Sequence, residues 1–181
     1  MRRAYVGGMT LISTAVRATH LVTNAAWFGG SLMGAVGLNA GAREPDTARE
    51  RVEVSGTGWE RWGPVQGAAV GLHLLSGLAI LADNSNRVAA HTPTTVAVIA
   101  KTVLTTAAVA STAAAWVYGN RLGKASGEGG HPTDPEAAER ARQKLSWLQW
   151  TTPALTGAML VLDAQLGEQQ RGLAGLLDRP W

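Results

Sequence analysis

Two histidines and one asparagine stand inside apolar segments of this sequence. His20 lies in "AVRATHLVTNAAWFGG", His73 lies in "VGLHLLSGLAILAD", and Asn24 follows His20 by four residues. An imidazole can donate or accept a hydrogen bond, transfer a proton or ligate a metal near neutral pH. We therefore take His20, Asn24 and His73 as the candidate polar site. The simpler interpretation is a histidine that is hydrogen-bonded to a neighbouring helix.

Four charged residues also lie within or at the ends of apolar runs: Arg17, Asp83, Lys101 and Asp163. An unpaired charge at the centre of a bilayer costs about 2.5–3.5 kcal/mol on insertion scales, and pairing offsets much of that cost. Our hypothesis is a charge layer in which the two cations meet the two carboxylates in two equivalent pairs. Two alternatives stay open: each charge marks the place where its helix leaves the hydrocarbon, or the group relays a proton or a substrate.

Several kinds of chemistry lack the residues that they require. The sequence has no cysteine, which excludes disulfides, thiolate metal sites and a cysteine nucleophile. It contains no P-loop, GxSxG or HExxH motif. The net charge is +3, but basic and acidic residues alternate in "AREPDTARERVE" and "DPEAAERARQK" and form no basic face. We expect no metal, no cofactor and no nucleic-acid partner.

The apolar residues are concentrated in four blocks, at about 9–38, 64–82, 93–118 and 146–166. A helix of about 20 residues crosses a hydrocarbon core of about 30 Å. The pattern predicts an all-α, four-transmembrane-helix bundle that forms a single integral membrane domain over 1–181. Two charged loops, 39–63 and 119–145, with short helices in their charged stretches, are expected on one side and both termini on the other. The distribution of Lys and Arg leaves the orientation open.

Similar segments recur along the chain. "LLSGLAILAD" at 74–83 matches "ALTGAMLVLD" at 154–163 at a shift of 80, and the first block matches the third at a shift of 82. The two shifts nearly agree, which predicts a tandem duplication of a two-helix hairpin. Glycines spaced four apart indicate tightly packed helices. Six aromatic residues at the loop ends of the helices indicate an interfacial belt: Trp59, Trp62, Trp116, Tyr118, Trp147 and Trp150.

Counting residues from the loop end of each predicted helix gives the depth of the polar groups. His20, Asp83 and Lys101 each lie 19 or 20 residues from that end, so they are expected at one level. His73 lies nine residues from Pro64, beside the small residues 29–31. The two histidines would then be separated by about 15 Å along the helix axis. That distance argues against a haem held between them. The polar faces of the helices indicate either a hydrogen-bonded network or the lining of a small cavity.

His20 followed by "WFGG" at 27–30 resembles the first helix of small bacterial integral membrane proteins of the copper-resistance-D-like kind. The "SG" at 76–77 and the "TG" at 156–157 match the dipeptide that these proteins carry in a neighbouring helix. The resemblance implies a small multi-pass protein of a bacterial plasma membrane. It implies no copper site here, because the four methionines form no cluster in the sequence.

The sequence favours a non-enzymatic integral membrane protein of accessory type, which binds a membrane partner, a second copy of itself or a lipid of the bilayer. The alternative is a membrane enzyme or transporter that acts on a small apolar compound, with His20, Asn24 and His73 lining the site. A haem or metal redox protein is a third interpretation.

Overall fold

A computed structural model describes the backbone of residues 2–85, 92–125 and 134–177 and the side chains of 11–47, 49–85, 95–124 and 134–165. The described chain is helical and contains no strand, which confirms the all-α bundle. The elements are α1 (Arg2–Met33), the π-helical turn η1 (Gly34–Leu38), α2 (Asn39–Gly41), α3 (Ala48–Asp83), α5 (Thr92–Ala125) and α6 (Pro135–Leu177).

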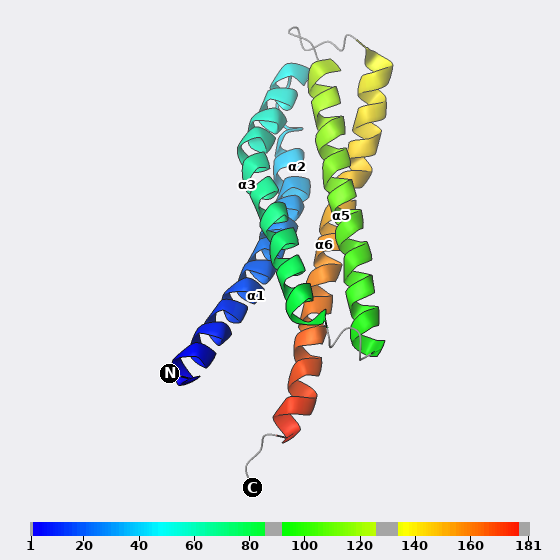
Figure 1. Ribbon diagram of the computed structural model, residues 1–181. Helices are drawn as coiled ribbons and strands as arrows, with labels where there is room; N and C mark the ends of the chain where they lie inside the picture. The colour runs from blue at the N-terminus through cyan, green and yellow to red at the C-terminus, as the bar shows by residue number, and fades with distance from the viewer. Residues whose placement is uncertain (1, 86–91, 126–133, 178–181) are drawn as a thin grey trace.

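The four long helices form two antiparallel hairpins (Figure 1). In the first hairpin α1 packs along α3, in the second α5 packs along α6, and α6 also contacts α1. By contrast, α3 and α5 touch at only a few positions, so one side of the bundle is loosely closed. The N-terminal part of α1 diverges from the other helices (Figure 1).

Three helices are long and apolar enough to cross a membrane: Leu11–Gly41, Arg49–Asp83 and Thr95–Lys124. The predicted fourth span, 146–166, is not among them. It lies within α6, where Gln149 and several threonines lower the hydropathy. The described part of the chain therefore has four long helices in one bundle, three of which are long and apolar enough to cross a membrane.

The expected bounds of the loop at 39–63 are wrong, because most of this segment belongs to one long helix and not to a loop with short helices. Thr47 forms a capping box with Glu50: its hydroxyl accepts a hydrogen bond from the Glu50 backbone N–H, and the Glu50 carboxylate accepts one from the Thr47 N–H. These two bonds satisfy backbone donors that a helix start leaves free, so α3 begins at Ala48. The connection between the first two helices is therefore only 42–47.

The expected loop at 119–145 is wrong for a similar reason. Asp134 accepts a hydrogen bond from the Ala137 backbone N–H at 2.9 Å, and Pro135 occupies the first helical position. Proline suits that position because no hydrogen bond is required of its nitrogen there. As a result α6 begins eleven residues before the predicted span, and α5 continues to Ala125.

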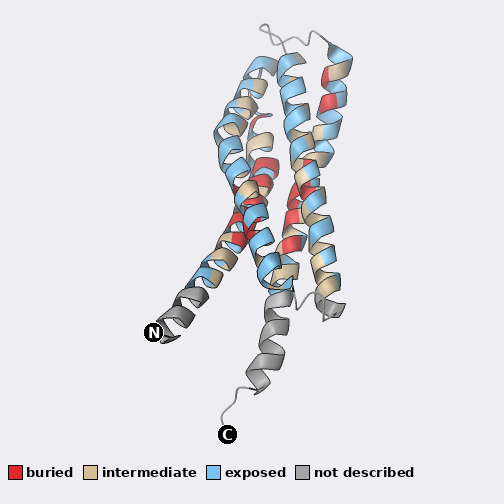
Figure 2. Cartoon of the chain, viewed as in Figure 1, coloured by how far each residue is buried: buried red, intermediate tan, exposed pale blue. Residues whose placement is uncertain are grey.

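Buried residues lie mainly in the middle of the bundle (Figure 2). Trp27, Ala108 and Met159, from α1, α5 and α6, are completely buried and form the apolar core. The outer faces of α3 and α5 carry exposed leucine and valine side chains, as expected of surfaces in contact with lipid.

Two glycines of the first hairpin make room for tryptophan rings. A side chain at Gly30 would overlap the indole of Trp62, and one at Gly34 would overlap the indole of Trp59. These glycines therefore receive side chains from α3 and do not bring two backbones together. We had expected His73 to lie beside Gly30, but Trp62 occupies that space.

Candidate functional site

His20 of α1 and His73 of α3 are stacked in the interior of the bundle. Their ring centroids are 3.9 Å apart and their planes differ by 15°. Both side chains are buried, and the edge of Trp27 faces His73 with 6.0 Å between the ring centroids. The two residues that were expected about 15 Å apart are therefore in direct contact.

The separation of the two histidines was predicted wrongly because residues of the second helix were counted from Pro64. Since α3 begins at Ala48 and not near Pro64, the hairpin turn lies earlier in the chain than expected. His73, and not Asp83, is consequently opposite His20. The pairs Gly30–Trp62 and Gly34–Trp59 follow the same antiparallel register.

The backbone determines which ring nitrogen of each histidine carries a proton. Nδ1 of His20 is 3.0 Å from the carbonyl oxygen of His73, and Nδ1 of His73 is 3.2 Å from the carbonyl oxygen of His20. A carbonyl oxygen can only accept a hydrogen bond, so both Nδ1 atoms must be donors. When the ring is neutral, the lone pair of each histidine is therefore on Nε2.

The dipeptide Ser76-Gly77 accommodates the His20 ring. Ser76 Oγ is 3.2 Å from Nδ1 of His20, and a Cβ at Gly77 would lie only 3.1 Å from Cε1 of the same ring. The matching glycine in α6, Gly157, has the same relation to Phe28, whose ring would lie 3.1 Å from an added Cβ. In both cases the glycine allows an aromatic ring of α1 to approach a neighbouring helix.

Lys101 of α5 connects the histidines to α6. Its Nζ forms an ion pair with Oδ1 of Asp163 and lies 3.4 Å from Nε2 of His20. The Lys101 and Asp163 side chains remain 19% and 11% exposed. The other carboxylate oxygen of Asp163, Oδ2, is buried and has no partner among the described residues. Four side chains are thus in contact in the order His73, His20, Lys101 and Asp163, and we call them the polar core. Each long helix contributes one of the four.

The other two residues of the predicted charge layer lie outside the polar core. Asp83 is exposed, ten residues beyond His73, and Arg17 makes its only described hydrogen bond to Ser13, at 3.5 Å. Neither forms an ion pair within the described part of the chain. The prediction of two equivalent pairs is wrong, because the two hairpins do not place Asp83 and Asp163 in equivalent surroundings. The tandem duplication itself stays a prediction.

Asn24 lies on the same face of α1 as His20 and is completely buried. Both polar atoms of its amide lack a partner among the described residues, as does the hydroxyl of Ser31. Trp27, between them, donates from Nε1 to Thr112 Oγ1 at 3.0 Å. Burying an unpaired amide in an apolar interior is costly. Asn24 is therefore available to a further hydrogen-bonding group.

A second group of polar contacts lies toward the short connection 42–47, and the sequence did not identify it as a unit. Asn39 accepts a hydrogen bond from Trp59 Nε1 at 3.0 Å and donates one to Gln149 at 3.2 Å, which joins three helices. Ser111 and Thr152 are hydrogen-bonded at 2.8 Å. The sequence signal was only the presence of polar residues inside apolar blocks.

The stacked histidines are not arranged as the two axial ligands of one haem iron. Two imidazoles that ligate one haem iron point at it from opposite faces, whereas these rings lie face to face. The planes of the two rings differ by only 15°, so their Nε2 lone pairs lie in nearly parallel planes. Among the side chains that the structure describes, no three His, Asp or Glu residues are grouped closely enough to hold a metal.

Comparisons with protein-family models, with curated proteins and with solved structures found no match for this chain.

Proposed function

We propose that this chain is a small membrane protein of accessory type that binds a lipid or another lipophilic molecule at its polar core. The helices long and apolar enough to cross a membrane support the membrane part of the proposal. The ligand part rests on the polar core, because ionisable residues inside a membrane are rarely placed there without a partner or a role.

The observation that carries the proposal is the incomplete pairing of Asp163. One of its carboxylate oxygens is bonded to Lys101, and the other is buried without a partner. In an apolar medium such an oxygen is stabilised by a hydrogen-bond donor, which a hydroxyl group carried by an amphiphilic ligand or formed from its carbonyl group would supply. Asn24 offers a further donor and acceptor deeper in the bundle.

The loose contact between α3 and α5 provides a direction of approach. These two helices form the least closed side of the bundle, and their exposed faces are apolar. A lipophilic molecule dissolved in the bilayer would reach the polar core from that side without passing through water.

Native mass spectrometry of protein purified in a mild detergent tests this function. We expect wild-type protein to retain a bound amphiphile. The double variant Lys101→Met/Asp163→Leu, which removes the pair without leaving an isolated charge, should lose it. The matched control is Arg49→Met/Glu53→Leu, which removes an exposed ion pair on α3. Equal retention by all three proteins would contradict the proposal.

A second candidate is an accessory protein that associates through a helix face. Gly63, Gly67 and Gly71 are spaced four apart on α3, and added Cβ atoms there would meet nothing within 4 Å. Small residues at this spacing allow close packing of membrane helices. A ligand-free dimer or complex in the same mass spectra would favour this candidate over ligand binding.

A further inference from the structure

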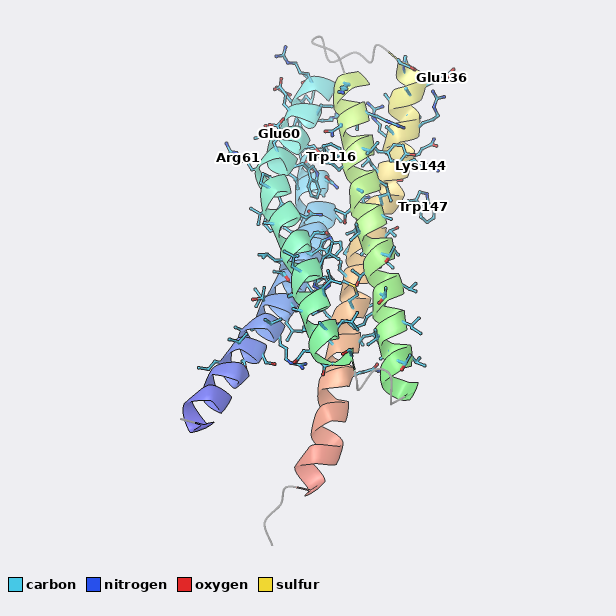
Figure 3. The ribbon with its side chains drawn as sticks, viewed as in Figure 1. Glu60, Arg61, Trp116, Glu136, Lys144 and Trp147 are labelled. Carbon is cyan, nitrogen blue, oxygen red and sulfur yellow. The ribbon has the colours of Figure 1, made fainter. Side chains whose placement is uncertain are left out.

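Lys101 differs from the other two lysines of the chain in its surroundings. Lys124 and Lys144 are exposed at the end of the bundle that carries the connection 42–47, where Figure 3 shows Lys144 on the outside of α6. Lys101 instead lies between helices, with its amine against Asp163 and His20. A primary amine in that position is mostly enclosed by the helices but remains accessible, because its side chain is 19% exposed.

His20 supplies a base beside this amine. Nδ1 of His20 donates a hydrogen bond to the His73 carbonyl oxygen, so the lone pair of the neutral ring is on Nε2. This Nε2 atom is 3.4 Å from Lys101 Nζ. An ammonium group is not nucleophilic, and a lysine becomes so when a neighbouring base removes a proton. His20 and Lys101 thus have the geometry of a base and a nucleophile.

Asp163 supplies the counter-ion. Its carboxylate already pairs with the Lys101 ammonium, and it would equally stabilise the positive charge of an iminium at the same nitrogen. The unpaired Oδ2 can accept a hydrogen bond from the water or hydroxyl formed on the way.

We infer that Lys101 binds a lipophilic aldehyde or ketone covalently, as a Schiff base. This inference rests on the proposed function, that the polar core takes a lipophilic ligand, and names the ligand's chemical class. The Lys101 ammonium gives a proton to His20, and the neutral amine attacks the carbonyl carbon. The carbinolamine then takes the proton back from His20 as water leaves. The products are a protonated imine paired with Asp163 and one water, so atoms and charge balance without an oxidant or reductant.

The apolar surface of α5 at this level favours a lipophilic carbonyl compound. Ile99 and Val103, two residues before and after Lys101, project from the opposite side of α5 and are 58% and 62% exposed, as expected for side chains in contact with lipid. A carbonyl compound that partitions into the bilayer therefore reaches the part of α5 that carries Lys101. A charged aldehyde remains in water and meets Lys124 and Lys144 first.

Reductive trapping tests the inference. Protein reconstituted in lipid vesicles is incubated with decanal and sodium cyanoborohydride, and the alkylated lysines are quantified by peptide mass spectrometry. We expect Lys101 to be modified faster than Lys124 and Lys144, and glyoxylate to reverse that order. His20→Gln should slow modification of Lys101 by about 10²-fold, the lower range for loss of a general base, and leave the other two lysines unchanged.

Two further variants keep the test decisive if His20→Gln does not fold. Lys101→Arg preserves the positive charge and should abolish the adduct at this position, and Asp163→Asn should reduce its yield. Modification of Lys101 no faster than of the exposed lysines would overturn the inference, as would an unchanged rate in a folded His20→Gln protein. If a ligand co-purifies with wild-type protein but decanal does not react at Lys101, the proposed function stands and this inference fails.

Discussion

At the scale of single residues, contacts within and around the polar core fix the orientation of the His20 ring. His20 is held by the His73 carbonyl, by Ser76 and by the space above Gly77, and it presents Nε2 to Lys101. Every one of these contacts comes from another helix. The orientation of the ring is therefore a property of the packed bundle and not of α1 alone.

The Lys101–Asp163 pair leads to a prediction of stability. Lys101→Met alone leaves a carboxylate uncompensated inside the bundle and should destabilise the fold by about 3–5 kcal/mol. Lys101→Met/Asp163→Leu should recover most of this loss, because no charge remains to be solvated. Unfolding in mixed detergent micelles measures both. Arg49→Met, which breaks an exposed pair, serves as the control and should leave stability unchanged. A double variant as unstable as the single one would show that the pair itself is required.

At the scale of the helices, the start of α3 determines which residues of the first hairpin meet. The capping box at Thr47 and Glu50 sets the turn, and the turn sets the antiparallel register that brings Trp62 to Gly30 and His73 to His20. The motif was visible in the sequence as Thr followed three residues later by Glu. The charged residues around it indicated only a short solvated helix, and not the start of the long helix that crosses the bundle.

Two glycine variants test this register. Gly30→Ala should destabilise the protein, because the added methyl group overlaps the Trp62 indole. Gly67→Ala should be neutral or stabilising, because its Cβ meets nothing within 4 Å and alanine favours the helix by about 1 kcal/mol over glycine. Thermal unfolding followed by circular dichroism compares the two. Trp62→Ala should suppress the defect of Gly30→Ala, and equal stability of the two alanine variants would refute the register.

At the scale of the whole molecule, two hairpins share a core and their aromatic residues fall into two groups. Trp116, Trp147 and Trp150 are 70%, 78% and 51% exposed, and Figure 3 shows Trp147 projecting outward from α6. Such exposure suits interfacial anchors. Trp59 and Trp62 pack against α1 instead, and the belt of six aromatic residues stays a prediction.

The number of membrane crossings is testable because the chain has no native cysteine. Single cysteines at Asp46, Asp134 and Ser85, and one appended after Trp181, can be labelled with a membrane-impermeant maleimide in sealed vesicles. Four crossings place Asp46→Cys and Asp134→Cys on one side, and Ser85→Cys and the appended cysteine on the other. An appended cysteine on the same side as Asp134→Cys would show that α6 does not cross.

The sequence by itself determined the class of the fold and most members of the site. Hydropathy depends only on local composition, so helical segments, an all-α bundle and the unusual positions of His20, His73, Lys101 and Asp163 were all predictable. The stripe that holds His20 and Asn24 followed from helical periodicity alone.

Only the tertiary structure decided which of these residues meet. Contact between antiparallel helices depends on the exact position of the turn, and a displacement of the turn by a few residues changes every pair along the hairpin. For that reason His73 replaced Asp83 opposite His20, and one ion pair formed where two were expected. The protonated nitrogen of each histidine was likewise decided in three dimensions, because the carbonyl that accepts its proton belongs to another helix.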